Sequence, residues 1–322
     1  MKKREWEKSK ALKLSLILML GLFLIVPVMA RETYEEKFSR VENLTRDGRV
    51  IISNVSGDIK VMVWKEEKVK IEAVKSASAS TQAKAKENAG RVTIEVTAEP
   101  GLVRIETKYP ESRGWFREDT NVSVDYTLWI PDQASIESRS VSGDVEVEKV
   151  GGSIRINSVS GNITILGGKK SISAKAVSGD IRVTEAEGDL ELNSVSGDIR
   201  ASQIKGSVEA EVVSGSVRLE GISEARRVSA KSISGTVEYR GQVLPDGNYR
   251  FSSHSGEVRL YLPADSSFDL EATSFSGSVT TDFPVEVMGK LSGKTIQGRV
   301  GKGGAEVVAK AFSGSVEIRK GS

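Results

Sequence analysis

The chain has 322 residues, of which 46 are Lys or Arg, 44 are Asp or Glu and one is His, and it contains no Cys. The lack of Cys excludes a disulfide framework, and a single His without Cys argues against a zinc or other transition-metal site, so we expect no cofactor. Residues 1–30 hold six of the basic and two of the acidic residues, which leaves 40 basic against 42 acidic residues beyond them. Such a nearly neutral chain argues against nucleic acid as a partner.

The first 30 residues have the composition of a secretory signal peptide. A basic stretch, Met1–Lys13, precedes the almost wholly apolar stretch Leu14–Val28, and small residues surround Met29 at the expected cleavage site. We therefore expect export to the periplasm, the cell surface or the medium. The alternative is that this segment is not cleaved and anchors the protein to a membrane.

Residues 31–134 are predicted to form an irregular amino-terminal β part. Alternation of apolar and polar residues predicts strands over Val50–Ser53, Asp58–Trp64, Lys68–Val74, Arg91–Thr97, Val103–Thr107 and Val122–Ile130. One short helix is predicted over residues 80–88, which are rich in Ala and Lys, and it is expected to cover an end of the fold. Trp115 and Phe116 are predicted either to make a contact site or to plug that end.

From residue 135 onward a five-residue phrase, Val/Ile-Ser-Gly-Asp/Ser-Val/Ile, recurs at a nearly constant interval. Its glycines follow one another at 18 residues and then at 20, 21, 21, 21 and 16, with one earlier copy at Gly57. In chain order they are Gly143, Gly161, Gly179, Gly197, Gly215, Gly235, Gly256, Gly277, Gly298 and Gly314. A period of this length indicates stacked repeats, each packed on its neighbours.

The residues around each glycine predict a corner between two short strands. Glycine suits a corner because it adopts positive φ without steric cost. The residue two places after it is always Val or Ile, as at Ile199, and is predicted to face inward. The residue two places before it, such as Val195, is also predicted to face inward, and His254 in this column is predicted to be a buried, neutral ring. Asp at either Val195 or Ile199 is thus expected to cost several kcal/mol.

The repeat leaves no room for a helix in each unit. A weaker half-step, with Gly152, Gly188 and Gly206 nine residues after a main glycine, adds a second corner. The predicted fold is therefore an all-β, single-stack β-solenoid over residues 135–322, with about ten coils of 18–21 residues about 4.8 Å apart. Aliphatic side chains would fill its narrow interior and leave no cavity for chemistry.

Two columns on the outside of the predicted coils are candidates for binding. Asp180 and Asp198, on adjacent coils, form a weak candidate Ca²⁺ site, or else are turn aspartates paired with nearby arginines. Arg182, Arg200 and Arg218 form a column that could bind an anionic glycan, or else is a solvated face. The short coils lack the long loops that build a catalytic groove, so we expect no enzyme, and a carbohydrate-active β-helix enzyme is the remote alternative.

The phrases themselves resemble those of the bacterial "putative adhesin" family of envelope β-solenoid domains. The resemblance rests on the repeated Val-Ser-Gly-Asp-Ile, on Ser255–Pro263, on Phe268–Val279 and on Phe312–Lys320. It implies a non-enzymatic, adhesin-like or scaffold module of the cell envelope that displays a repetitive surface to a glycan or protein partner. A regulatory accessory protein of the envelope-stress response is the alternative.

Overall fold

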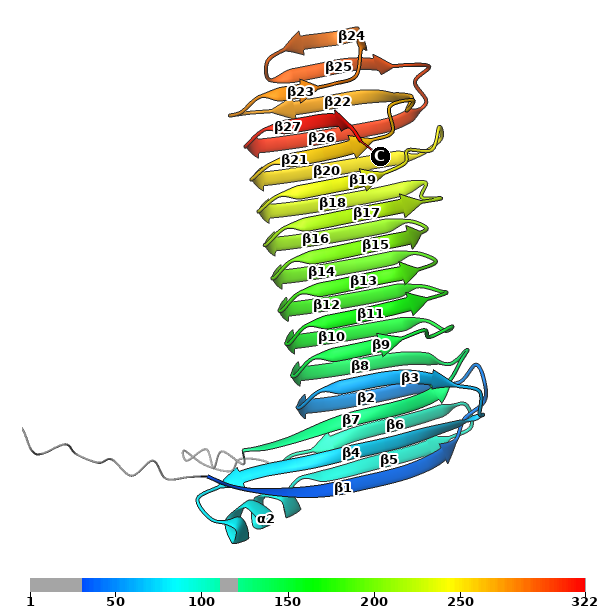
Figure 1. Ribbon diagram of the computed structural model, residues 1–322, viewed down its shortest axis with the longest axis vertical. Helices are drawn as coiled ribbons and strands as arrows, with labels where there is room; N and C mark the ends of the chain where they lie inside the picture. The colour runs from blue at the N-terminus through cyan, green and yellow to red at the C-terminus, as the bar shows by residue number, and fades with distance from the viewer. Residues whose placement is uncertain (1–30, 111–120, 322) are drawn as a thin grey trace, which may run out of the picture.

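The fold is a stack of two-strand coils, and the strands of the coils form two β-sheets that face each other (Figure 1). The part of the chain that is described contains one helix. The computed structural model describes residues 31–110 and 121–321. Sheet A has 13 strands and sheet B has 14. The prediction of an all-β solenoid with an irregular amino-terminal part and one short helix is confirmed, and each coil contains two strands.

Each coil has one strand in sheet B and the next strand of the chain in sheet A. In spatial order, the coil strands of sheet B are β2 (Arg49–Ser56), β8 (Ser135–Ser142), β10 (Ile154–Ser160), β12 (Ile172–Ser178), β14 (Leu190–Ser196), β16 (Val208–Ser214), β18 (Arg227–Ser234), β20 (Asn248–Ser255), β26 (Ala305–Ser313) and β22 (Phe268–Ser274). Those of sheet A are β3 (Ile59–Trp64), β9 (Val145–Glu148), β11 (Ile163–Gly168), β13 (Ile181–Ala186), β15 (Ile199–Lys205), β17 (Val217–Ser223), β19 (Val237–Gly241), β21 (Val258–Leu262), β27 (Val316–Lys320) and β23 (Val279–Thr281). Parallel pairing joins equivalent residues of neighbouring coils, as in Ile181 with Ile199.

The remaining elements lie at the two ends of the stack. Sheet A continues into β7 (Val122–Pro131), β4 (Lys68–Ala79) and β1 (Glu32–Asn43), and sheet B into β6 (Leu102–Lys108) and β5 (Thr93–Glu99). The helix α2 (Gln82–Gly90) lies beside β1 and β4 at this end (Figure 1). The hairpin of β24 (Val285–Ser292) and β25 (Thr295–Val300) closes the other end. The six amino-terminal strands predicted from alternation are present, and the sequence pattern missed only β1.

The short helix forms where composition predicted it, shifted by two residues. Thr81 has extended backbone and its hydroxyl accepts a hydrogen bond from the backbone N–H of Lys84 (3.3 Å), which satisfies one of the free donors at a helix start. The face of α2 formed by Ala85, Asn88 and Ala89 is buried. The described residues include no helix of the length and hydropathy needed to cross a bilayer.

The interior is filled by aliphatic columns from both sheets. The β-branched residue two places after each corner glycine is buried, as Ile163, Ile181 and Ile199 show with no exposed surface. Sheet B contributes two further buried columns, represented in β14 by Leu190 and Leu192. Stacking identical β-branched residues at one strand spacing packs them without gaps, so the repeated sequence itself builds the core.

The corner glycines are required by two constraints at once. Gly197 has φ of 135°, in the region that glycine favours, and a Cβ there would lie 2.2 Å from the carbonyl oxygen of Gly179 in the preceding coil. Gly161, Gly179 and Gly215 repeat this geometry. The half-step glycines also form corners, since Gly206 has φ of 131° and approaches the Gly188 carbonyl in the same way.

The predicted inward column two places before the glycine was wrong. In β14 the small side chain of Ser194 faces inward and is buried, whereas Val195 is 49% exposed. Alternation stops at the corner, so the buried positions on its two sides, Ser194 and Ile199, are five residues apart instead of an even number. His254, in the same column, is exposed, not buried as predicted. Because Val195 is exposed, the expected loss of several kcal/mol for Asp at this position no longer applies.

The coils do not all stack in chain order. The last coil, β26 with β27, lies between the β20–β21 coil and the β22–β23 coil (Figure 1). Gly298, which the spacing predicted to be a corner, lies inside the antiparallel strand β25. At the other end the β2–β3 coil lies between the β8–β9 coil and strands β6 and β7. The first and last coils along the chain therefore both lie inside the stack, with other strands beyond them in each sheet.

Candidate functional site

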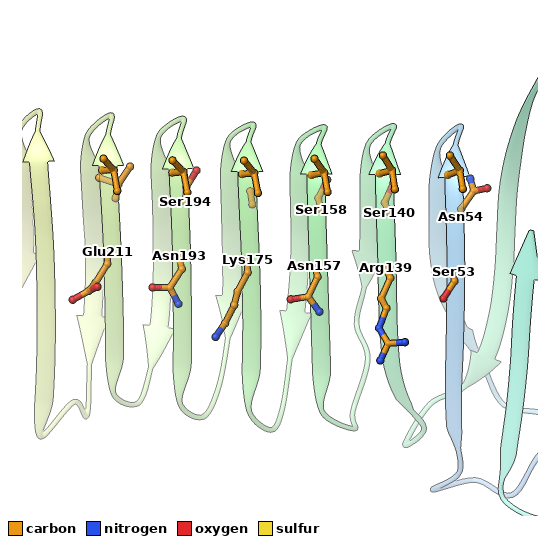
Figure 2. Close-up of a pocket in the computed structure, with 18 of the residues that line it drawn as sticks. Ser53, Asn54, Arg139, Ser140, Asn157, Ser158, Lys175, Asn193, Ser194 and Glu211 are labelled. Carbon is orange, nitrogen blue, oxygen red and sulfur yellow. The ribbon is translucent and has the colours of Figure 1, made fainter. Parts of the chain in front are cut away.

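A groove of about 830 Å³ runs across the outer face of sheet B, perpendicular to its strands (Figure 2). Its floor contains the exposed aliphatic residue that precedes each corner by two places. We call this set the valine stripe: Val55, Val141, Val159, Val177, Val195, Val213 and Ile233. Each member is between 42% and 51% exposed, although sheet B has a full apolar core beneath it. Seven aligned, half-exposed aliphatic side chains form a contiguous apolar surface.

Polar side chains run beside the valine stripe at the next outward position of each strand. We call this set the polar ladder: Ser53, Arg139, Asn157, Lys175, Asn193, Glu211 and Lys231 (Figure 2). Some of its members form ion pairs with each other or with a neighbouring residue of sheet B. Lys175 lies 2.6 Å from Glu191 and Lys231 lies 3.6 Å from Glu211. The Lys175 hydrogen bond lowers the pKa of Glu191, so this carboxylate stays charged at neutral pH.

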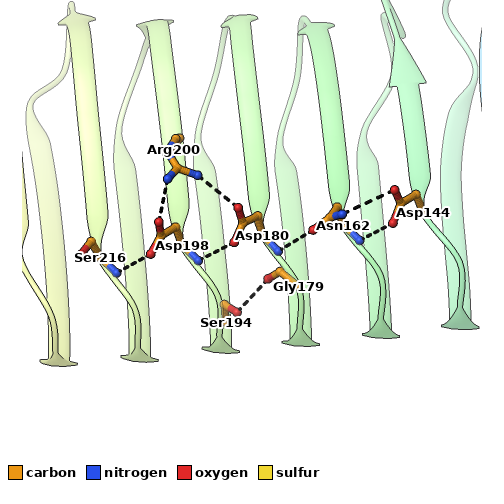
Figure 3. Close-up of polar contacts among 8 residues, drawn as sticks. All are labelled: Asp144, Asn162, Gly179, Asp180, Ser194, Asp198, Arg200 and Ser216. Carbon is orange, nitrogen blue, oxygen red and sulfur yellow. Dashed lines mark hydrogen bonds and ion pairs between the residues drawn. The ribbon is translucent and has the colours of Figure 1, made fainter.

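Small hydroxyl residues lie directly under the valine stripe and tie neighbouring coils together. Ser232 Oγ donates to the carbonyl of Gly215 (2.9 Å), and Ser253 Oγ donates to that of Gly235 (2.8 Å). Ser194 makes the equivalent, longer contact to Gly179 (3.3 Å; Figure 3). Within the described residues, the buried hydroxyls of Ser140 and Ser158 have no partner. Ser140 and Ser158 occupy the equivalent position of their strands without making this bond, so the small size of the residue is the feature that the series shares.

The groove reaches strand β6 at the amino-terminal end of the stack. Glu106 and Thr107 line it there, and Thr107 Oγ1 lies 2.7 Å from the hydroxyl of Tyr126. Burial raises the pKa of Tyr126 to about 12, so its hydroxyl stays protonated and the pair remains a neutral hydrogen bond. Glu106 is therefore the charged residue of the lining at this end.

Aromatic rings continue the valine stripe toward the other end of the molecule. His254 stacks on Phe312 with centroids 4.7 Å apart, and Phe312 stacks on Phe275 at 4.8 Å. These distances equal one strand spacing, because the rings come from β20, β26 and the end of β22. The rings cover one another's faces, and Phe275 at the end is 66% exposed. A sugar ring would need a free aromatic face, which this stacking leaves only at Phe275.

A second ladder, on the far side of the corners, joins the turns. From Asp58 to Ser216, the side-chain oxygen of the residue after the glycine accepts a hydrogen bond from the backbone N–H of its equivalent in the next coil, as Figure 3 shows between Asp144 and Ser216. Asp180 accepts from Asp198 (2.8 Å), and Asp198 accepts from Ser216 (2.9 Å). Asn162 performs the same role, accepting from Asp180 (3.0 Å). The residue type thus serves the turn backbone.

Asp180 and Asp198, the candidate calcium ligands, lie on adjacent coils and share a guanidinium. Arg200 lies 2.6 Å from Asp198 and 3.2 Å from Asp180, through the carboxylate oxygens that the backbone does not use (Figure 3). Among the described residues no group of three or more His, Cys, Asp or Glu side chains is arranged to hold a metal ion. Both oxygens of each carboxylate therefore already have partners within the protein.

The arginine column lies on the opposite face of the molecule from the groove. Arg182, Arg200 and Arg218 are in register on β13, β15 and β17 of sheet A. Arg218 also approaches Glu238, at 3.5 Å. The other residues predicted as a contact surface, Trp115 and Phe116, lie outside the described residues, as does the predicted signal segment.

Sequence reasoning missed the valine stripe because it assigned apolar residues inward. One signal could have revealed it: three places before the glycine stand Ser140, Ser158, Ala176 and Ser194, which are small. A small residue fits the crowded interior next to a corner, and adjacent residues of a strand point to opposite faces. The small residue inside therefore implies the valine outside.

Comparison with known proteins identifies the architecture. A model of the family described as "Toastrack DUF4097" matches residues 48–319. Three solved structures resemble the chain: a "putative adhesin" from Parabacteroides distasonis (13% identity, 89% of this chain and 97% of that one, TM-score 0.51), a "putative adhesin" from Bacteroides fragilis (13%, 88% and 97%, 0.40) and a "putative cell adhesion protein" from Clostridium sporogenes (14%, 90% and 100%, 0.22). No curated protein matches. At these identities the likeness concerns the fold alone.

Proposed function

Because this chain belongs to the Toastrack DUF4097 family, we propose that it is an exported, non-enzymatic, adhesin-like scaffold that contacts a protein partner through the groove of sheet B. The observation that carries the proposal is the valine stripe. Its aliphatic side chains are half-exposed on seven consecutive coils, where a soluble surface would be expected to be polar. The structural relative from Parabacteroides distasonis is described as a "putative adhesin", and the valine stripe is a surface on which adhesion can act.

Protein is favoured over glycan by the chemistry of the groove. Its apolar part is aliphatic, and its polar ladder alternates amides and charges instead of presenting rings for sugars to stack on. An apolar centre with a polar rim is the usual composition of a protein–protein interface. The arginine column of sheet A remains the surface on which an anionic glycan would bind, and the two faces can be tested separately.

The test compares variants of the two faces in an attachment assay. Beads coated with the full-length protein are mixed with cells that produce it and with a glycan array. We expect the double variant Val177→Asp with Val195→Asp to reduce attachment to cells at least tenfold, because it places charges in the groove. The matched sheet A variant, Arg182→Ser with Arg218→Ser, is expected to change attachment less than twofold. Both pairs are exposed, so melting temperatures should stay close to that of the unmodified protein.

The opposite result would refute the proposal. If the sheet A variant lost both attachment and glycan binding while the sheet B variant kept them, the arginine column would be the contact surface.

A further inference from the structure

The valine stripe repeats at the distance between neighbouring strands of a β-sheet, so a partner stays aligned with it only if its own side chains repeat at that distance. Neighbouring members come from adjacent parallel strands, so they are about 4.8 Å apart along the stack. Residues on one face of a partner strand repeat at about 6.6 Å, and turns of a partner helix at about 5.4 Å. Either partner would lose alignment with the stripe after two or three contacts. A second solenoid of the same spacing stays aligned over the whole length.

We infer that the partner is a second copy of this chain, docked face to face and antiparallel through the valine stripe, an inference that rests on the proposed function. The stripe and its aromatic extension follow the order Val55, Val141, Val159, Val177, Val195, Val213, Ile233, His254, Phe312 and Phe275. Val195 is the fifth of these ten members. A two-fold axis through Val195 therefore overlaps the first nine members of the two copies, with Val177 opposite Val213 of the other copy, and leaves Phe275 beyond the overlap.

The charges of the polar ladder select this register. With Val195 opposite itself, Lys175 of each copy lies opposite Glu211 of the other, and Asn193 lies opposite Asn193. Moving the two-fold axis by half a coil shifts one copy by a whole coil relative to the other. In one direction this places Lys175 opposite Lys231, and in the other direction it places Arg139 opposite Lys231. Like charges facing each other at an interface oppose binding, so the centred register is preferred.

The size of the overlap is adequate for a specific complex. Nine rungs span about 38 Å, and the outer face from the polar position to the turn is about 17 Å wide, so each copy would bury roughly 650 Å². Specific interfaces bury about 800 Å² per partner, with weaker ones below that value. We therefore expect a reversible dimer, of the strength suited to contact between cells or between molecules on one cell.

The experiment uses the fact that the chain has no Cys. Single cysteines replace Ser196, Ser142 or Ser56, which follow members of the stripe at the corners and leave the stripe intact. Each full-length variant is spin-labelled, and distances between copies are measured by double electron–electron resonance. In the antiparallel register the distance is shortest at Ser196→Cys and grows by two strand spacings per coil, to about 30 Å at Ser142→Cys and about 40 Å at Ser56→Cys.

Sedimentation measures the association itself. The unmodified protein is expected to dimerise, and Val177→Asp with Val195→Asp is expected to abolish the dimer while keeping the melting temperature. That variant retains residues 1–30, so association through those residues would persist in it and would contradict the inference. Equal distances at all three labels would indicate parallel copies and would also overturn it.

A protein that stays monomeric at about 100 µM would rule out self-docking, since weak specific complexes still associate at that concentration. The attachment assay then decides the proposed function separately. Attachment that depends on the stripe in a monomeric protein would mean that a different protein occupies the groove, and attachment independent of the stripe would remove both proposals.

Discussion

At the scale of single residues, the corner explains most of the recurring chemistry within the repeat. At the corners the glycine leaves no room for a side chain against the preceding coil, and the backbone N–H after it donates to that coil, as Asp198 shows. At some corners a serine hydroxyl before the glycine donates to it as well, as Ser232 shows. In an isolated loop these polar groups would bond to water, whereas here they bond to the preceding coil. The repeated phrase is therefore a set of contacts between coils, and its serines and aspartates need no catalytic explanation.

Replacing Gly197 with Ala should destabilise the protein strongly. The added methyl would lie 2.2 Å from a backbone oxygen and the residue would keep a φ of 135°, so we expect a loss of about 2–4 kcal/mol in the free energy of unfolding. Gly90→Ala is the control, because no neighbouring atom lies within 4 Å of the place its methyl group would take. Denaturant unfolding of both variants measures the difference, and equal midpoints would contradict the corner geometry.

The turn ladder predicts that Asp198 tolerates Asn better than Ala. Asn keeps an oxygen to accept from the Ser216 N–H, as Asn162 does in its own coil. Ala leaves that donor without its acceptor, so we expect a loss of about 1 kcal/mol, against less than about 0.5 kcal/mol for Asn. Thermal melting distinguishes the two. Equal losses for Asn and Ala would contradict the prediction and would show that the charge, through Arg200, matters more than the acceptor.

Acid should weaken one contact at the amino-terminal end in a defined pH range. Arg46 makes a bidentate pair with Asp132, with both contacts at 2.8 Å, and its hydrogen bond lowers the Asp132 pKa from 3.8 to about 2. A carboxylate whose pKa is lower in the folded state stabilises the fold fully at a pH above its unfolded-state pKa. This stabilisation is lost as the pH falls through the folded-state pKa. The difference in melting temperature between the unmodified protein and Asp132→Asn should therefore be largest above about pH 4. It should shrink toward zero as the pH falls from about 4 to about 2. A difference independent of pH would exclude this pair as the cause.

At the scale of elements, the corner separates two strands that each alternate but are out of phase with each other. Sequence alone predicted the strands, the corners and the inward column after the glycine, because β-branched residues and glycines determine them locally. The phase before the corner was predicted wrongly. Valine is apolar on either face, and the one local sign of the phase is the small residue beside it, Ser194, which occupies the interior.

Replacing two β-branched residues of one coil with Asp should therefore lower the free energy of unfolding by very different amounts. Ile199→Asp buries an unpaired charge and should cost several kcal/mol, whereas Val195→Asp remains at the surface and should cost less than about 1 kcal/mol. Urea unfolding compares the two variants directly. Similar losses would show that Val195 is buried in solution.

At the scale of the whole molecule, sequence predicted a stack but not its order at the ends. Spacings of 21, 21 and 16 residues at the carboxyl end looked like further coils. The hairpin around Gly298 instead pairs antiparallel with β22, and the final coil joins β20. Strand order is set by contacts between segments far apart in the sequence, and no local pattern records it. The groove needs seven coils in register, so its extent is seen only in three dimensions.

Removing residues 305–322 should disorder more than the coil they form. β26 pairs with both β20 and β22, and β27 with both β21 and β23, so a chain ending at residue 304 leaves β22–β25 without a parallel neighbour. We expect hydrogen exchange to lose protection over residues 268–300 while β10–β17 keep theirs as an internal control. Full protection of residues 268–300 would mean that the end hairpin is stable alone.

The inserted position of the last coil also bears on how the molecule resists force. A tether pulling on the carboxyl terminus loads β27 and β26 along their length, and each of these strands is flanked on both sides by parallel neighbours. Many backbone hydrogen bonds must then shear together, whereas a strand at an open edge would peel away one bond at a time. A molecule built this way can carry tension from its end into the body of the stack without unravelling from its tip.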